Sequence, residues 1–204
     1  MKVGVLDLQG DVIEHVRALE AAGAEVVRVK RPRHLEGLRG LVIPGGESTT
    51  IGKLMAEYEL IPAVRQAVSE GMAVFGTCAG AILLAADIAG SDQPRLGLMD
   101  MRVQRNAYGR QRESFEAEVQ VSEIPGPPVK AVFIRAPIIE RVGSSVKVLA
   151  EYGGQIVMAR QGRLLAGTFH PELTADRRVH QYFLQLCAED AEGRGPGAGA
   201  DRLR

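Results

Sequence analysis

The chain of 204 residues has few cysteines, no tryptophan and no excess charge of either sign. Its two cysteines, Cys78 and Cys187, cannot build a disulfide framework and lack the clustered spacing of a zinc site. Lys and Arg number 25, as do Asp and Glu, so there is no basic excess to attract nucleic acid or an anionic membrane surface. We therefore expect neither as a partner.

Long apolar runs are also missing, since none reaches the ~20 residues needed to span a bilayer. Residues 1–6 lead directly into Asp7 and Asp11, which is not the pattern of a secretory signal peptide. Hydrophobic residues nevertheless make up 46% of the chain, enough to build one buried core. These features predict a cytoplasmic globular protein and leave open whether either cysteine is reactive.

The first half of the chain alternates between short apolar segments and segments with helical periodicity. Strands are expected at 3–8, 25–30, 40–43 and 73–76, and helices at about 12–22, 48–58, 62–71 and 78–86. Ser48 or Thr49 is the expected cap of the second helix. Apolar strands separated by helices are typical of a parallel sheet covered on both faces, so this half predicts a doubly wound α/β fold.

The second half changes to strands joined by short turns, expected at 101–104, 114–121, 129–135, 146–152, 155–160 and 164–169. They predict a mixed extension of a mostly parallel sheet. A last helix over about 176–189 carries Val179, Phe183, Leu186 and Cys187 on one apolar stripe. Residues 1–190 are thus expected to form a single domain. Residues 191–204 have little to bury and are expected to be a disordered tail.

Cys78 lies in the segment Gly76-Thr77-Cys78-Ala79-Gly80, where an apolar strand turns into a helix. Small residues allow a tight turn, and the cysteine side chain then projects above the sheet edge as in a nucleophile elbow. The helix N-terminus favours a thiolate, and the amide of Ala79 is free to bind an oxyanion. The alternative is a buried structural cysteine, and this segment alone does not decide between the two.

A nucleophilic thiol needs a base, and histidine is the usual one at neutral pH. His15 and His180 fall on the first and last helices, where we interpret them as solvated. His34 lies in a loop and has no evident partner. His170 differs, because it directly follows a strand and precedes Pro171-Glu172. It is therefore the candidate base.

Glu172 is the candidate third member of the site. In an extended segment, residues two apart point to the same side, so His170 and Glu172 can lie together. A carboxylate beside an imidazole fixes its tautomer and stabilises the imidazolium. A His-x-Glu triple often arises by chance, but combined with the cysteine elbow it gives a candidate triad of Cys78, His170 and Glu172.

A third loop, Pro44-Gly45-Gly46-Glu47-Ser48, follows the apolar strand at 40–43. Its paired glycines let backbone amides approach a ligand closely, and open α/β sheets bind ligands at this end of their strands. The loop is a candidate second oxyanion donor, with Glu47 and Ser48 near the substrate, and a plain turn with a helix cap is the alternative. The spacing of a phosphate-binding P-loop is absent.

Taken together, the Pro-Gly-Gly-Glu-Ser loop, the Gly-Thr-Cys-Ala-Gly elbow and the His-Pro-Glu segment resemble a class I, or triad, glutamine amidotransferase. Segments 8–10, 105–111, 133–137 and 169–174 narrow the resemblance to the glutaminase subunits of pyridoxal 5′-phosphate synthases. The match covers roughly residues 1–190. It implies a flavodoxin-like α/β sheet with helices on both faces. Asp7 and Asp11 are less typical of this family.

The resemblance also implies a role for each site residue. Cys78 would attack the side-chain amide of L-glutamine, His170 would carry the protons and Glu172 would orient His170. The amides of Gly46 and Ala79 would bind the oxyanion. The glutamine-binding positions of the family match Gly46, Glu47, Ser48, Arg105, Ile134 and Arg135. An arginine suits the substrate carboxylate because it can donate two parallel hydrogen bonds.

A separate synthase partner follows from the same resemblance. Ammonia would pass to a (β/α)₈ barrel, the synthase subunit of a heteromeric complex that is contacted through Gln9 and the first helix. No metal and no cofactor are implied, because pyridoxal phosphate would be the product of the partner. Cys187 is expected to belong to the core.

Three alternatives remain open from the sequence. The first is the glutaminase subunit of another synthase, such as imidazole glycerol phosphate synthase. The second is a triad hydrolase that acts alone, either a peptidase or a γ-glutamyl hydrolase. The third is a non-catalytic α/β protein, which would form no thioester at Cys78. The first two share the candidate triad and differ in whether activity depends on a partner.

Overall fold

The computed structural model describes residues 1–105 and 114–189. Most of segment 105–111, which supports the family resemblance, and the expected tail at 191–204 therefore lie outside the described residues. Within the described ranges, no helix combines the length and the apolar character that crossing a membrane requires.

The parallel part of the main sheet is built from the segments expected in the first half of the chain. Its strands are β1 (Lys2–Leu6), β2 (Glu25–Val29), β3 (Gly40–Ile43), β4 (Ala73–Thr77) and, from far along the chain, β12 (Leu164–Gly167). They lie in the order β2-β1-β3-β4-β12 with every neighbouring pair parallel. The ends of β3, β4 and β12 are thereby brought to one edge of the sheet.

Five further strands extend this sheet through four antiparallel pairings and one parallel pairing at the outer end. These strands are β5 (Ala85–Ile88), β6 (Met99–Gln104), β9 (Ile138–Val142), β10 (Lys147–Tyr152) and β11 (Gln155–Gln161). The order continues from β12 through β11, β9 and β6 to β5, and β10 pairs with β11. Strands β7 (Ser114–Val119) and β8 (Val129–Ile134) form a separate antiparallel pair. The mixed, mostly parallel sheet is confirmed.

Two strands, β5 and β9, are not expected from the sequence pattern. The helix expected over 78–86 is correspondingly shorter, because α4 spans only Ala79–Leu84. Ala85 already has an extended backbone, with φ −64° and ψ 138°, and begins β5. A short apolar run is compatible with either a buried helix or a buried strand. Periodicity alone therefore misplaces the boundary between α4 and β5.

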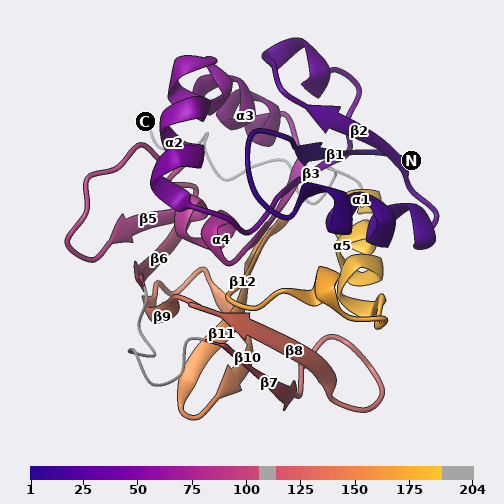
Figure 1. The fold of residues 1–204 in the computed structure, drawn as a ribbon, viewed down its shortest axis with the longest axis vertical. Helices are drawn as coiled ribbons and strands as arrows, with labels where there is room; N and C mark the ends of the chain where they lie inside the picture. The colour runs from indigo at the N-terminus through magenta and orange to yellow at the C-terminus, as the bar shows by residue number, and fades with distance from the viewer. Residues whose placement is uncertain (106–113, 190–204) are drawn as a thin grey trace, which may run out of the picture.

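Helices cover both faces of the parallel strands (Figure 1). The helices of one face are α1 (Val12–Ala21) and α5 (Arg178–Ala188), and those of the other are α2 (Ser48–Glu57), α3 (Leu60–Ser69) and α4. Two 3₁₀ turns, η1 (Pro32–Leu35) and η2 (Pro171–Leu173), complete the described elements.

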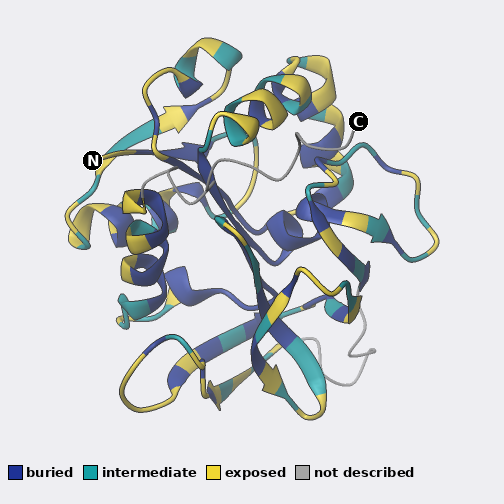
Figure 2. Ribbon diagram, turned by 180° about the vertical axis from the view of Figure 1, so that it is seen from behind, coloured by how far each residue is buried: buried dark blue, intermediate teal, exposed yellow. Residues whose placement is uncertain are grey.

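The core lies on both sides of the sheet, as a doubly wound fold requires. In β3, Leu41 and Ile43 join the cluster formed with α2, α3 and α4, whereas Val42 joins the cluster formed with α1 and α5. The alternation follows from the two-residue repeat of a strand. Figure 2 shows the central strands buried from end to end between the two helical layers.

A cluster of polar side chains ties the antiparallel strands to α5. The carboxylate of Glu123 accepts hydrogen bonds from Lys147 in β10, Arg160 in β11 and the hydroxyl of Tyr182 in α5. The hydrogen bonds with Lys147 and Tyr182, opposed by a smaller effect of burial, lower the pKa of Glu123 to about 2. The cluster therefore stabilises the fold only while Glu123 is ionised.

Replacement of Glu123 by Gln tests this cluster through the pH dependence of stability. The folded-state pKa of about 2 lies below the reference value of 4.5, so the stabilisation is present above pH 4.5 and is lost as the pH falls toward 2. Thermal unfolding should show Glu123→Gln melting a few degrees below wild type at neutral pH, with the gap closing by about pH 2. Glu116→Gln, in an exposed pair with Lys130, is the control. A gap of the same size at both pH values would contradict the assignment.

Candidate active site

Cys78 lies between β4 and α4 with φ 48° and ψ −104°, a conformation that residues other than glycine rarely adopt. Two close approaches hold this turn. A Cβ on Gly76 would lie 2.4 Å from the carbonyl carbon of Gly80, and one on Gly80 would lie 2.0 Å from the carbonyl oxygen of Ile43. The two glycines therefore let α4 start directly against β3 and β4. The structure thus has the expected elbow at Cys78.

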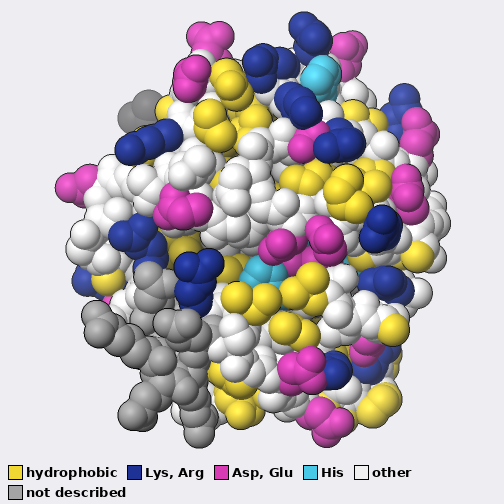
Figure 3. Space-filling view, viewed as in Figure 1, with side chains coloured by type: hydrophobic (Ala, Val, Ile, Leu, Met, Phe, Trp, Pro, Cys, Tyr) yellow, Lys and Arg dark blue, Asp and Glu magenta, His cyan; other side chains and the backbone are white. Residues whose placement is uncertain are grey.

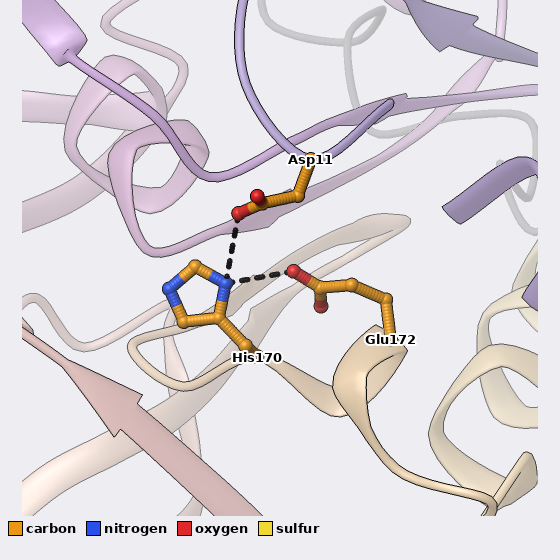
Figure 4. A group of neighbouring side chains, drawn as sticks. All are labelled: Asp11, His170 and Glu172. Carbon is orange, nitrogen blue, oxygen red and sulfur yellow. Dashed lines mark hydrogen bonds and ion pairs between the residues drawn. The ribbon is translucent and has the colours of Figure 1, made fainter. Parts of the chain in front are cut away.

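His170 is fixed at the end of β12 by its backbone amide, which donates to the carbonyl oxygen of Val132 at 2.8 Å. Its Nδ1 lies 2.7 Å from Oε1 of Glu172 and 3.3 Å from Oδ2 of Asp11 (Figure 4). His170 and Glu172 are buried, and Asp11 is half-buried. Glu172 reaches the imidazole from the 3₁₀ turn η2 and not from the extended segment that we expected, so the contact forms with a different local geometry.

The charges of this group are strongly coupled. Burial by itself would lower the pKa of His170, because a buried imidazolium loses its hydration. Side-chain hydrogen bonds with Asp11, Cys78 and Glu172, together with the charge of Glu172, outweigh burial and raise this pKa far above its usual range. Burial raises the pKa of Glu172, while the hydrogen bond and charge of His170 oppose that rise. The surroundings therefore hold an imidazolium between a carboxylate and Cys78.

Asp11, His170 and Glu172 each offer a ligand atom, and these atoms lie within 4.8 Å of one another. Such a spacing would also suit a metal ion. A metal would have to bind Nδ1 of His170 through a lone pair, but that nitrogen lies at hydrogen-bond distance from a carboxylate oxygen and donates its proton there. Hydrogen bonding within the group therefore accounts for the cluster.

The glycine loop after β3 is held by the loop after β1. The amide of Glu47 donates to Oε1 of Gln9 at 2.8 Å, and the amide of Asp11 donates to the carbonyl oxygen of Gly45 at 3.1 Å. A Cβ on Gly46, whose φ is +152°, would lie 2.5 Å from Oε1 of Gln9. The positive φ favours glycine at this position, and the hydrogen bond from the amide of Glu47 lets Gln9 restrain the loop that carries the candidate oxyanion amide.

Helix α2 is capped by Glu47, and the expectation of a Ser48 or Thr49 cap is wrong. The carboxylate of Glu47 accepts from the amide of Thr50 at 2.6 Å. Burial tends to raise the pKa of Glu47, but hydrogen bonds from Thr50 and Thr49 lower it below its usual range. Ser48 is the first helical residue, and its hydroxyl lies 3.5 Å from Oε1 of Gln93. Glu47 caps because it is the residue with an extended backbone before the first turn.

A cavity of about 380 Å³ lies between these loops. It is lined by Gln9, Gly10, Asp11, Gly46, Glu47, Ser48, Cys78, Ala79, Ile82, Arg105, Ile134, Arg135 and His170. Every residue predicted for the site except Glu172, which lies behind His170, therefore faces one hollow. On the face drawn in Figure 3, a histidine lies near the centre, with acidic side chains above it and basic ones to its left.

The antiparallel half of the chain contributes the two arginines of the cavity. Arg105, after β6, donates through Nη1 to Oγ1 of Thr49 and to Oε1 of Gln93, both at 3.1 Å. Arg135, after β8, has φ 42°. The preceding carbonyl, that of Ile134, lies 3.8 Å from Sγ of Cys78. Positive charge for a carboxylate is thus available beside the thiol.

Four residues around the site are not predicted to belong to it from the sequence. These are Asp11, which contacts the imidazole, Gln93, which contacts Arg105, and the pair His15 and His180. The expectation that both histidines are solvated is wrong, because each is fully buried. The spacing carries a signal for this: His15 lies three residues after Val12 and four before Leu19, on the face of α1 that is buried.

The remaining histidine and cysteine lie away from the cavity. Contrary to expectation, His34 has a partner, because the amide of Lys30 donates to its Nδ1 at 3.1 Å. Cys187 is buried in α5 against Gly40 of β3, where an added Cβ would lie 2.3 Å from Sγ. Burial raises the pKa of Cys187 to about 12, so this thiol stays protonated. Its place in the core is confirmed.

A larger hollow, of about 550 Å³, opens where β3, β4 and β12 begin, among Leu35, Arg39, Met72 and Arg163. The guanidinium groups there donate to backbone carbonyls, including those of Gly71 and Cys187. No histidine or cysteine is among the described residues that line it. Size alone therefore does not make it a site of thiol chemistry.

The fold, with a cysteine elbow after β4 and a His-Pro-Glu segment after β12, is that of a class I glutamine amidotransferase. A crystal structure of a glutamine amidotransferase matches with a TM-score of 0.88 at 53% identity, over 92% of this chain and 99% of that one. The structure of PurLQS from Thermotoga maritima has the same fold, with a TM-score of 0.66 at 17% identity over 90% of this chain and 97% of that one.

The model of the SNO glutamine amidotransferase family matches residues 5–189, and the chain belongs to this family. It is 62% identical to the pyridoxal 5′-phosphate synthase subunit PdxT of Niallia circulans, over 93% of this chain and 99% of that protein. It is 59% identical to the subunit of the same name from Pelotomaculum thermopropionicum, over 92% of this chain and 95% of that protein. The family resemblance seen in the sequence is confirmed.

The elbow geometry predicts a strong effect of one added methyl group. In Gly80→Ala, the new Cβ would collide with the backbone of β3, which cannot move aside without disturbing the sheet. We expect a loss of stability of about 3 kcal/mol or more, measured by denaturant unfolding. The control is Gly162→Ala, where nothing lies within 4 Å of the new Cβ and φ is +57°. It should cost only about 1–2 kcal/mol of backbone strain. Equal losses would show that the contact with β3 is unimportant.

Proposed function

We propose that this protein is the glutaminase subunit of a pyridoxal 5′-phosphate synthase, which hydrolyses L-glutamine to L-glutamate and ammonia through a thioester on Cys78. One observation carries the proposal. The cavity brings Cys78, the His170–Glu172 pair and two arginines together in a chain that is 62% identical to a subunit of such a synthase. The two free thiols suit a reducing compartment and support a cytoplasmic location.

In the proposed reaction, the thiolate of Cys78 attacks the side-chain amide carbon of glutamine. His170, which has taken the proton of the Cys78 thiol, gives it to the leaving nitrogen, which departs as ammonia, and a γ-glutamyl thioester remains. His170 is then neutral and takes a proton from water, which attacks the thioester and releases glutamate. Glu172 holds the imidazole in one tautomer and stabilises its charged form through Nδ1.

Oxyanion binding is proposed for the amides of Gly46, in the glycine loop, and of Ala79, at the start of α4, because both residues line the cavity together with Cys78. Each preorganised donor of this kind typically contributes about 3 kcal/mol to a transition state. Arg105 and Arg135 would bind the α-carboxylate of glutamine, and Glu47, Ser48 and the carbonyl of Ile134 complete the contacts to the substrate. The substrate is a small zwitterion, so it needs charges of both signs close together.

A partner is part of the proposal, because ammonia released without an acceptor is lost to water. We propose a synthase subunit with a (β/α)₈ barrel, bound in a heteromeric complex through Gln9 and the start of α1. Gln9 supports this assignment because it lies on the rim of the cavity and holds the amide of Glu47. Docking there would rearrange the oxyanion loop, so we expect the isolated protein to be nearly inactive.

The nucleophile is tested with Cys78→Ala, assayed as glutamate release in the presence of the synthase subunit. We expect the rate to fall by at least ~1,000-fold, because a thioester can no longer form. Cys187→Ala is the matched control and should keep the rate within about twofold, since that thiol lies in the core. An unchanged rate in Cys78→Ala would refute the assignment.

Assays with and without the partner separate the proposal from its alternatives. A hydrolase that acts alone would release glutamate at its full rate without any partner. A glutaminase of another synthase would bind that synthase and fail to bind the pyridoxal 5′-phosphate synthase subunit in size-exclusion chromatography. Activity that rises on addition of the pyridoxal 5′-phosphate synthase subunit supports the proposal.

The role of Gln9 is tested with Gln9→Ala. This change leaves the amide of Glu47 without its acceptor and loosens the loop that carries Gly46. The partner-stimulated rate should fall about 5- to 10-fold, as expected for one lost hydrogen bond of roughly 1–1.5 kcal/mol. The control is Gln66→Ala, an exposed glutamine on α3 whose side-chain amide donates to Glu70. A stimulated rate equal to wild type in Gln9→Ala would remove Gln9 from the coupling.

A further inference from the structure

Two buried histidines that the proposed reaction does not use lie directly behind the triad. Nδ1 of His15 in α1 lies 3.1 Å from Nε2 of His180 in α5. Nε2 of His15 lies 3.0 Å from Oγ1 of Thr77 and 3.4 Å from Oε2 of Glu172. Both imidazoles are fully buried, and neither lines the cavity. A continuous chain of polar contacts therefore runs from His180 through His15 to the carboxylate of Glu172, which contacts His170.

Both of these histidines are neutral. Burial lowers the pKa of His15 well below its usual range, and electrostatic coupling to the neighbouring His180 and to His170 lowers it further. Burial and the charge of Arg177 lower the pKa of His180 to about 4. Each ring therefore has one N–H donor and one acceptor nitrogen, and the geometry decides where each proton lies.

The contacts select one tautomer. If Nε2 of His180 donates to Nδ1 of His15, then His15 carries its proton on Nε2, between Oγ1 of Thr77 at 3.0 Å and Oε2 of Glu172 at 3.4 Å, and Nδ1 of His180 is left as a bare acceptor. In the reverse arrangement, Nδ1 of His180 carries a buried proton without a partner among the described residues, and the lone pair of His15 faces the carboxylate. Buried N–H groups are almost always paired, whereas bare acceptors are tolerated more often.

The surroundings of Oε2 of Glu172 favour the same tautomer of His15, with its proton on Nε2. Oε2 is buried and has no hydrogen-bond partner of ordinary geometry among the described residues, and Nε2 of His15 lies 3.4 Å away. A buried carboxylate oxygen without a donor is costly. Hydrogen bonds of a catalytic group are often long in a ligand-free site and shorten as charge develops on the reacting groups.

We propose that His15 is a positioning residue of the triad, whose Nε2–H holds Oε2 of Glu172 so that Oε1 stays directed at Nδ1 of His170. His180 acts one step further back by donating to His15 and so keeping its proton on Nε2. This inference rests on the proposed glutaminase function and adds two residues to its proton machinery. It also connects α1, through His15 and Glu172, to the base His170.

The first test uses His15→Phe and His15→Gln in complex with the synthase subunit. His15→Phe removes the donor, and kcat should fall roughly 10- to 100-fold while KM stays within about twofold, because His15 does not reach the substrate cavity. His15→Gln retains an N–H donor, and it should recover the rate to within roughly threefold of wild type. Equal rates in the two variants, or a wild-type rate in His15→Phe, would overturn the proposal.

A double-mutant cycle separates this role from a loss of packing. If His15 acts through Glu172, then adding His15→Phe to Glu172→Ala should lower kcat no further. An undiminished His15→Phe penalty in that background would overturn the proposal. Leu19→Val, equally buried on α1 in the hydrophobic core, controls for stability and should lower the melting temperature without changing kcat.

A readout without turnover distinguishes failure of this inference from failure of the proposed function. Alkylation of Cys78 by iodoacetamide near pH ~6, followed by peptide mass spectrometry, reports the reactivity of the thiol beside His170. It should be several-fold slower in His15→Phe than in wild type and should recover in His15→Gln. If wild type releases no glutamate, the proposed function fails. If alkylation does not differ between wild type and His15→Phe, the positioning role fails.

Discussion

The hydrogen bond between Nδ1 of His170 and Oε1 of Glu172 is the contact on which the site depends, because it places two ionisable groups inside the protein. Desolvating such a pair costs several kcal/mol per ion unless further polar groups compensate. Compensation comes from three segments that are distant in the sequence. Asp11 approaches the imidazole from the loop after β1, His15 approaches the carboxylate from α1, and Thr77 contacts His15 from the end of β4. The order of the parallel strands is what brings these segments to one edge.

Backbone strain is concentrated at the same edge. Two of the non-glycine residues with positive φ, Cys78 and Arg135, line the cavity, and each such conformation costs about 1–3 kcal/mol. Packing around the elbow supplies the restraint. Because α4 starts against β3 at distances that only Gly76 and Gly80 permit, Cys78 has no relaxed position available without separating helix from sheet. A rigid thiol is useful for attack, since a nucleophile held near its reacting position has already lost its orientational freedom.

The sequence predicts the architecture and the centre of the site well, for reasons that are local. Apolar strands, small residues around Cys78 and the spacing of His170 and Glu172 are all readable within a few residues. The misses depend on tertiary contacts. His15 and His180 are polar residues on apolar helical faces, and only the meeting of α1 and α5 shows that each supplies the other's partner. Strands β5 and β9 likewise depend on pairing partners that local periodicity does not contain, whereas the Glu47 cap is a local contact with the amide of Thr50.

The parallel strands and the antiparallel strands carry different parts of the proposed site. The parallel strands β1, β3, β4 and β12 end in the loops that carry Gln9, the glycine pair, Cys78 and His170, so the reacting groups are anchored where the core is buried on both faces. The antiparallel strands β6 and β8 end in Arg105 and Arg135, which face the same cavity. The two arginines proposed to bind the substrate carboxylate therefore lie in a more exposed part of the molecule than Cys78 and His170. A chain with no net charge can bind a zwitterion in this way, because the charges that matter are local and are placed by strand order.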